Sequence, residues 1–174
     1  MLIRRETPAD WPRVRHLVSD AFSSPQQGAR GASEPAEARL LDWLRADIDW
    51  LPRLSLVAVT QDQIVGHVLC SRGRVDGRPA LGLAPLSVIS TQQGRGIGTG
   101  LMHAVLAAAD ALDEPLVALL GDEGYYSRFG FVPASRVGID APDAAWGDHF
   151  QVRTLTRYSG QTGRFKYAEP FARL

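Results

Sequence analysis

Cysteine is almost missing from this chain of 174 residues, which contains only Cys70. One thiol cannot close an internal disulfide or supply a cysteine-rich zinc site, so we expect no metal and expect Cys70 to be a buried strand residue. A surplus of basic residues is missing too, because 19 Lys and Arg residues are balanced by 19 Asp and Glu residues. Proteins that bind nucleic acids usually carry such a surplus, so no nucleic-acid partner is expected.

Long apolar runs are also missing. The chain opens with Met1–Thr7, and no stretch after it has the apolar length of a signal peptide or a membrane span. We therefore expect a cytoplasmic protein without a membrane partner. Apolar residues make up 45% and charged residues 22%, which is ordinary for a globular protein, and the length suits a single domain over residues 1–174.

The order of the apolar residues predicts a mixed α/β (α+β) domain around one sheet. Helical spacing predicts helices after Thr7, from Glu34 to Ile48 and over Thr99–Leu112. Pro85 cannot donate a ladder hydrogen bond, so it predicts an edge or a bulge in its strand. β-Branched and apolar stretches predict strands at Leu2–Arg5, Leu54–Thr60, Ile64–Ser71, Ala80–Ser90, Leu116–Leu120, Val137–Ile139 and Phe150–Leu155.

The most informative stretch is a glycine-rich turn between the strand that contains Pro85 and the long third helix. It holds four glycines within the seven residues from Gly94 to Gly100. Without Cβ atoms, successive N–H groups can converge, and the helix that follows adds free N–H groups and the positive end of its dipole. Such a turn is typical of a phosphate or pyrophosphate site, to which Arg95 can add a permanent positive charge.

Two common phosphate-binding patterns are not met. The chain lacks Gly-x-x-x-x-Gly-Lys-Ser/Thr, which disfavours a P-loop NTPase. It also lacks Gly-x-Gly-x-x-Gly, because Thr99 or Leu101 occupies the third glycine position. The turn lies mid-chain behind a hairpin, where a dinucleotide-binding fold rarely begins. A nucleotide-binding protein with another fold is therefore the weaker alternative.

The pattern that does fit is Gln-x-x-Gly-x-Gly, which runs from Gln93 to Gly98. With this pattern between a strand and a helix, the chain resembles the GNAT superfamily of N-acetyltransferases from Ile3 to about Pro133. The resemblance implies a GNAT-like fold, in which one mixed sheet with splayed central strands is flanked by helices. It also implies transfer of acetyl from acetyl-CoA to a primary amine by direct attack in a ternary complex, without a metal.

In this family the pattern is the pyrophosphate-binding signature for coenzyme A. The bulged strand before it bonds the pantetheine arm and polarises the acyl carbonyl, which fits the free N–H groups that a bulge exposes. By position, the resemblance implies that the cofactor is bound by Leu86, Ser87, Val88, Gln93, Gly94, Arg95, Gly96, Ile97, Gly98 and Thr99.

The segment Tyr125–Phe131 resembles the family's Tyr-x-x-x-Gly-Phe landmark. The match implies that Tyr126 is the catalytic acid that protonates the departing CoA thiolate, while simple packing is the alternative for both tyrosines. Thiols have a pKa of about 8.5 and phenols one of about 10, so a phenol can hydrogen-bond an emerging thiolate. One departure is that Gly121–Gly124 lacks the asparagine that many members carry before this tyrosine.

The acceptor side has no clear base for deprotonating the amine. His67, Asp122 and Glu123 are candidates by position, but a structural histidine and helix-capping carboxylates are the favoured alternatives. The resemblance implies an acceptor pocket near Phe22–Ala38, where Ser23–Ser33 has the composition of a mobile loop. Protein N-termini, lysines and small amines all remain open as acceptors.

Two further expectations concern the alternatives to a simple enzyme. A non-catalytic acyl-CoA-binding sensor would keep the Gln93–Gly98 turn but lack turnover. The C-terminal tail carries aromatic residues that suggest a homodimer interface, namely Tyr158, Phe165, Tyr167 and Phe171.

Overall fold

The computed structural model describes residues 1–23 and 35–174. The α-helices are α1 (Trp11–Phe22), α2 (Ala36–Arg45), α3 (Ile97–Ala111) and the short α4 (Glu123–Tyr126). Short 3-10 helices include η1 (Pro8–Asp10), η7 (Ala144–His149) and η8 (Glu169–Arg173). The strands are β1 (Leu2–Arg5), β2 (Ser55–Thr60), β3 (Gln63–Val75), β4 (Arg78–Val88), β5 (Leu116–Leu120), β6 (Val132–Pro133), β7 (Ile139–Asp140), β8 (Phe150–Thr154) and β9 (Gly163–Lys166).

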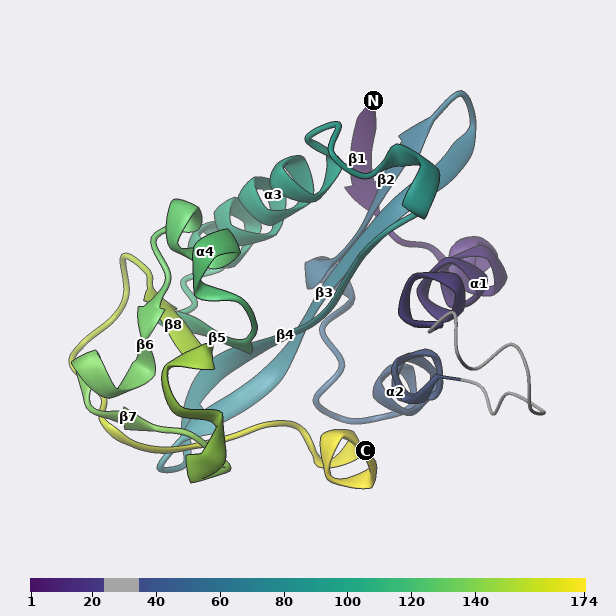
Figure 1. Cartoon of the computed structure of the whole chain (residues 1–174). Coiled ribbons are helices and arrows are strands. Elements are labelled where there is room, and N and C mark those ends of the chain that lie inside the picture. Colours follow the sequence, from purple (N-terminus) through teal and green to yellow (C-terminus); the bar gives the residue numbers. More distant parts are fainter. Residues whose placement is uncertain (24–34) are drawn as a thin grey trace.

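One mixed sheet organises the molecule. Its main path runs β1-β2-β3-β4-β5-β8-β6, and β9 pairs with both β3 and β7. Along the main path β4 and β5 are the parallel neighbours, whereas the other pairs are antiparallel. Figure 1 shows α3 and α4 on one side of the sheet and α1 and α2 on the other. Helices on both faces of a mixed sheet are the architecture that the sequence predicts.

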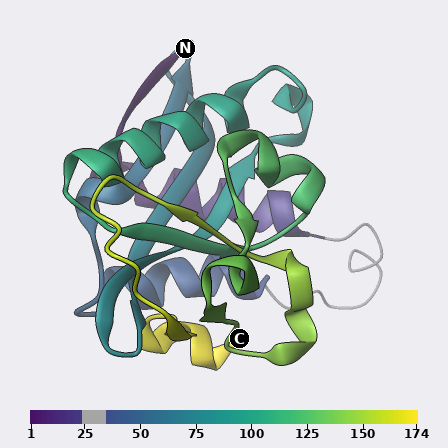
Figure 2. The ribbon, with the colours of Figure 1, turned by 90° about the vertical axis from the view of Figure 1, so that its left-hand side faces the viewer.

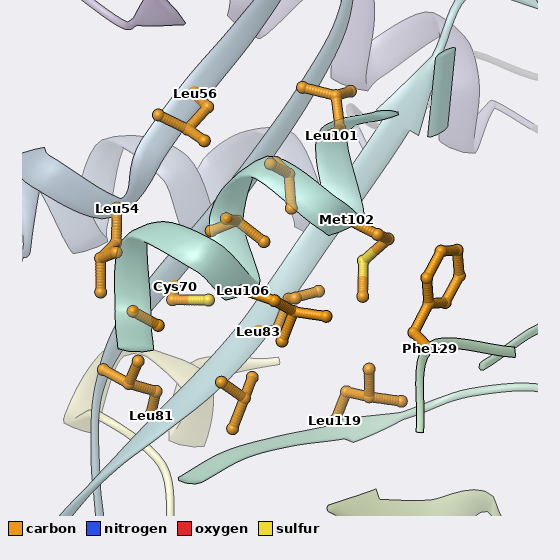
Figure 3. Close-up of a cluster of buried hydrophobic side chains, with 14 of the residues drawn as sticks. Leu54, Leu56, Cys70, Leu81, Leu83, Leu101, Met102, Leu106, Leu119 and Phe129 are labelled. Atoms are coloured by element: carbon orange, nitrogen blue, oxygen red, sulfur yellow. The ribbon is translucent and has the colours of Figure 1, made fainter. Parts of the chain in front are cut away.

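The largest cluster of buried apolar side chains lies between α3 and the sheet (Figure 3). Leu101, Met102 and Leu106 recur at helical spacing on α3, and all three are buried against side chains of the central strands. Cys70 lies in the same cluster and is fully buried, as the sequence predicts. In the orientation of Figure 2, α3 crosses in front of the strands that it covers.

The helix α2 is shorter than its apolar spacing predicts. It ends at Arg45, and Ile48, which the spacing places on the apolar stripe, is 96% exposed. The Asp47 Oδ1 atom accepts a hydrogen bond from the Asp49 N–H at 2.8 Å. This local partner competes with the helical hydrogen bond, and the helix stops before Ile48.

The strand predictions fail mainly where distant segments of the chain pair with one another. The strand β3 continues past its predicted end at Ser71 to Val75, where it pairs with Phe165 of β9. The sequence did not predict β9 at all, and Val137, expected on a strand, lies in a 3-10 helix instead. These short strands exist because distant segments pair, which their local composition does not indicate.

The aromatic residues of the C-terminal tail pack against other side chains of the same chain. Phe165 is only 1% exposed and its ring lies 5.4 Å from that of Phe150, while the rings of Tyr167 and Phe171 are 4.6 Å apart. These contacts use much of the apolar surface that suggested a homodimer. Self-association therefore stays a prediction that the tail no longer supports.

A buried polar network joins the β1–α1 connection to the sheet. Glu6 Oε1 accepts a hydrogen bond from Arg45 Nε at 2.9 Å, and Oε2 accepts one from Ser55 Oγ at 3.0 Å. His67 Nε2 lies 2.9 Å from the same Oε2 atom, and its ring is fully buried. Burial lowers the pKa of His67, so the ring is neutral and donates its Nε2–H to Glu6.

We expect Glu6→Gln to reduce both stability and its acid dependence. Burial by itself would raise the pKa of Glu6, but hydrogen bonds from His67 and Arg45 outweigh it and lower the pKa from 4.5 to about 2. Because its pKa is depressed, the Glu6 carboxylate stabilises the fold above pH 4.5, and this stabilisation is lost as the pH falls towards 2. The full shift corresponds to about 3 kcal/mol, of which about 2 kcal/mol is lost between pH 7 and pH 3. Urea unfolding at these two pH values should therefore show a smaller loss of stability in the variant than in the wild type.

The control for this experiment is Asp62→Asn, which removes an exposed carboxylate from the β2–β3 turn. It should keep the wild-type acid dependence. If Glu6→Gln also kept it in full, the stabilising role of the Glu6 carboxylate would be wrong.

Candidate active site

The central strands β4 and β5 diverge after a short contact. Their only paired residues in the described chain are Leu81 with Val117 and Gly82 with Ala118. Beyond Gly82, β4 continues to Val88 with β3 on one side and without a strand partner on the side of β5. The N–H groups on that open edge are available to a ligand that lies between the two strands.

A bulge in β4 lies where the two strands part. Val68 of β3 is opposite Leu86, but Cys70 is opposite Leu83, so β4 carries one extra residue over this interval. The extra length falls at Ala84–Pro85, and the bulge predicted from Pro85 is confirmed. A bulge bends its strand and increases the local twist, which helps to move β4 away from β5.

The glycine-rich turn leads from β4 into α3 with its N–H groups free. Gly94 and Gly96 have φ angles of +74° and +79°, a conformation that strongly favours glycine. Gln93 Nε2 donates to the Val88 carbonyl oxygen at 3.1 Å and so holds the turn against the end of β4. The helix begins at Ile97 rather than at the predicted Thr99, and its first turn leaves N–H groups without helical partners.

A cavity of about 540 Å³ lies at this turn. It takes in eight of the ten predicted cofactor-binding residues, whereas the buried Ser87 and the exposed Arg95 do not line it. Three lining residues, Gln92, Tyr125 and Arg128, were not predicted for this role. Its full lining is Leu86, Val88, Gln92, Gln93, Gly94, Gly96, Ile97, Gly98, Thr99, Tyr125 and Arg128.

Arg128 places a guanidinium at this cavity, which Arg95 does not line. Its guanidinium lies 4.8 Å from the centre of the Tyr125 ring, and Nη2 donates to the Gly124 carbonyl oxygen at 3.4 Å. The side chain thus belongs to the cavity wall opposite the glycine-rich turn. Together with the α3 N-terminus it makes this cavity favourable for an anion. The Tyr125–Phe131 landmark contained Arg128, but its role depends on how α4 packs.

A second cavity of about 590 Å³ holds Tyr126. Leu86 lines both cavities, so they meet at the bulged part of β4. The rings of Tyr125 and Tyr126 are 4.9 Å apart, with Tyr125 on the first cavity and Tyr126 on the second. Burial raises the pKa of Tyr126 to about 12, so its hydroxyl stays protonated at neutral pH.

Gly121 creates the space that the Tyr126 ring occupies. A Cβ atom at this position would lie 2.9 Å from Tyr126 Cδ2 and closer still to Cε2.

We expect Gly121→Ala to displace the Tyr126 ring and to lower kcat about 10-fold, because small misplacements of a reacting group are costly. Steady-state kinetics together with calorimetry of CoA binding would check this, and the CoA Kd should change little. Gly124→Ala is the matched control, since its Cβ would meet only the Asp122 side chain, at 3.0 Å. Equal kcat values for Gly121→Ala and the wild type would contradict the proposed fit.

The three candidate bases have structural roles or open surroundings. His67 is fully buried and bonded to Glu6, so it does not reach the second cavity. Asp122 caps α4 by accepting the Tyr125 N–H at 2.8 Å. Glu123 is exposed and lines neither cavity. The structure therefore shows the favoured alternatives, a structural histidine at His67 and a helix cap at Asp122.

Part of the predicted acceptor pocket lies outside the described residues. The expected mobile loop Ser23–Ser33 falls almost wholly in residues 24–34, so only the ends of the Phe22–Ala38 segment can be placed. Within residues 1–23 and 35–174, no group of three or more His, Cys, Asp or Glu side chains could hold a metal ion. The same part of the chain has no helix with the length and apolar character of a membrane span.

Comparison with known proteins places this architecture among acetyltransferases. The model of the acetyltransferase (GNAT) family matches residues 11–131. The uncharacterized N-acetyltransferase YhbS of Escherichia coli K12 is 33% identical over 178 residues, which cover 99% of each chain. The uncharacterized N-acetyltransferase YjhQ of the same strain is 32% identical, with 87% of this chain and 89% of its own covered.

Two solved structures show the same fold. The crystal structure of YhbS from Escherichia coli in complex with CoA has a TM-score of 0.85 and 32% identity, covering 99% of this chain and 92% of its own. A GNAT family acetyltransferase from Brucella melitensis in complex with acetyl-CoA has a TM-score of 0.75 and 30% identity, with 98% and 97% covered. The predicted fold, a mixed sheet with splayed central strands and flanking helices, is thereby confirmed.

Proposed function

The chain belongs to the acetyltransferase (GNAT) family, and from this premise we propose that it transfers an acetyl group from acetyl-CoA to a primary amine. The amine attacks the thioester directly while both substrates are bound. The observation that carries the proposal is the first cavity, where the glycine-rich turn, the α3 N-terminus and Arg128 surround one space.

The first cavity supports binding of the CoA pyrophosphate. Free N–H groups from Gly94 to Thr99 and the α3 dipole suit a diphosphate, and Gln93 holds the turn in position through Val88. The solved relatives from Escherichia coli and Brucella melitensis contain CoA and acetyl-CoA. Ser87 and Arg95 do not line the cavity, so their contact with the cofactor stays a prediction from the resemblance.

The open edge of β4 supports placement of the thioester. The pantetheine arm would lie between β4 and β5, with the acyl carbonyl near Leu86 and Val88. Backbone N–H groups there would stabilise the oxyanion that forms when the amine nitrogen attacks the carbonyl carbon. No cysteine lies at this point, because Cys70 is buried in the core, so direct transfer without a covalent enzyme intermediate fits the site.

Tyr126 would act on the departing sulfur. When the intermediate collapses, the C–S bond breaks and the thiolate needs a proton or a strong hydrogen bond. A pKa of about 12 for Tyr126, compared with about 8.5 for a thiol, makes complete proton transfer uphill by about 5 kcal/mol. Its main contribution is then a hydrogen bond to the thiolate. The thiolate finally takes up one proton to become the free thiol, which balances the proton that the amine loses.

Two measurements test the proposed function. Calorimetry with CoA, ATP and NAD should give binding of CoA alone, and an amine-library screen with acetyl-CoA should give free thiol and acetylated amine in equal amounts. Binding of CoA without acetylation of any amine would favour a non-catalytic acyl-CoA-binding sensor. Tight binding of ATP without binding of CoA would overturn the proposal. We expect the protein to act in the cytoplasm.

A further inference from the structure

Building on the proposed function, we propose that the acceptor is a primary amine carried on an uncharged apolar body, and that Glu37 pairs with its ammonium group. The inference concerns the second cavity, which lies beside the bulged part of β4. Its lining is Phe22, Glu37, Leu40, Leu83, Ala84, Pro85, Leu86, Leu120, Tyr126, Trp146, Tyr167, Phe171 and Leu174.

The position of this cavity fits the acceptor rather than the cofactor. It shares Leu86 with the first cavity and contains the hydroxyl-bearing ring of Tyr126. Its other walls come from α1, α2 and the C-terminal segment, which lie away from α3 (Figure 1). A molecule in the second cavity can therefore approach a thioester on β4 from the side that the cofactor does not occupy.

The walls of the second cavity are mainly apolar and aromatic. The rings of Trp146 and Tyr167 lie 6.3 Å apart and those of Tyr167 and Phe171 lie 4.6 Å apart, so three rings form a continuous surface. Phe22 and Leu120 also line it, although they are 38% and 46% exposed. Large apolar side chains left exposed around a cavity indicate a ligand whose own apolar surface covers them.

Glu37 is the one acidic or basic side chain among the described residues that line this cavity. It is half-buried in the first turn of α2, where the helix dipole favours the carboxylate. Within the described chain the carboxylate has neither an ion pair nor a hydrogen bond. A carboxylate side chain on an apolar wall attracts an ammonium group and repels a second carboxylate, so amines without an acidic group are favoured.

The chemistry of an amine substrate agrees with this charge. A primary amine arrives mostly as an ammonium ion, which Glu37 can hold at the cavity. The nucleophile must then lose one proton to solvent before its nitrogen attacks the acyl carbon. Glu37 is therefore a specificity-determining residue in this proposal. It binds the ammonium group and takes no part in the acetyl transfer itself.

The test compares two acceptors that share a phenyl ring and a primary amine. Phenethylamine lacks a carboxylate and phenylalanine carries one. We expect wild-type kcat/KM to be at least 10-fold higher for phenethylamine than for phenylalanine. Glu37→Gln should lower kcat/KM for phenethylamine about 10-fold and leave kcat/KM for phenylalanine unchanged or higher. The preference for phenethylamine over phenylalanine should then largely disappear. The Asp62→Asn control removes a distant exposed carboxylate and should keep the wild-type preference.

A second variant and a binding measurement separate this inference from the proposed function. Phe22→Ser changes an exposed residue at the end of α1 and should raise the KM for phenethylamine about 5-fold without affecting the CoA Kd. Calorimetry of phenethylamine with CoA-saturated protein should show weaker binding to Glu37→Gln. If polar or anionic amines were acetylated best, the inference would be wrong while the enzyme activity stood. The same would follow if Glu37→Gln lowered kcat/KM for both acceptors by the same factor. If no amine were acetylated at all, the proposed function itself would fail.

Discussion

Replacement of Tyr126 by phenylalanine is expected to lower kcat by about 10²- to 10³-fold, because the variant loses the hydrogen bond to the departing thiolate. The ring itself should stay in place, since it packs against Tyr125 and Phe131 through contacts that do not involve the hydroxyl. The Kd for CoA should therefore remain near the wild-type value. Steady-state kinetics with the best acceptor, followed by calorimetry with CoA, would measure both quantities.

The neighbouring tyrosine provides the control. Tyr125→Phe removes a hydroxyl from the first cavity, where it faces the glycine-rich turn, and should alter cofactor affinity more than kcat. A large kcat effect for Tyr125→Phe and a negligible one for Tyr126→Phe would show that the roles of the two residues are reversed. An unchanged kcat in both variants would exclude a tyrosine from the departure of the thiolate.

Replacement of Gly96 by valine is expected to weaken CoA binding by at least about 10²-fold. A β-branched residue is strongly disfavoured at the φ of +79°, so the turn must rearrange and its N–H groups lose their alignment. Loss of two charge-assisted hydrogen bonds, worth about 1.5–3 kcal/mol each, accounts for an effect of this size. The Cβ itself meets no protein atom within 4 Å, so the expected loss comes from the backbone conformation and not from a clash inside the protein.

A matched glycine elsewhere separates cofactor binding from stability. Gly160 has the same φ of +79°, and a Cβ there also meets nothing within 4 Å, but it lines neither the first nor the second cavity. Gly160→Val should lose a similar amount of stability and keep the wild-type CoA Kd. If both variants bound CoA normally, the glycine-rich turn would not be the pyrophosphate site.

The cofactor side of the site could be predicted because its chemistry is local. The glycines, the helix that follows and the strand before them lie within one short segment, and Pro85 marked the bulge in that strand. Backbone N–H groups of consecutive residues carry the proposed binding, so the order of residues is sufficient to place them. The family, the fold and the class of enzyme predicted from this segment are confirmed.

Other parts of the site could not be predicted because they depend on packing between distant segments. Arg128 lines the first cavity and Arg95 does not, because the segment that follows α4 lies beside the glycine-rich turn. His67 is a candidate base by its place in the sequence, but in the structure it is a neutral, buried ring in contact with Glu6.

By itself the sequence determined the order of the main elements and the presence of a glycine-rich turn before a helix, because hydrogen bonding along the chain and the periodicity of apolar residues act over a few residues. Only the tertiary structure decided which side chains share a cavity. The second cavity gathers residues from α1, α2, β4, β5, α4, η7 and the C-terminal segment, and no local pattern relates them. Its apolar walls and the single carboxylate of Glu37 arise when the helices and the tail close over the parted strands, since burial, charge and distance are properties of the folded chain.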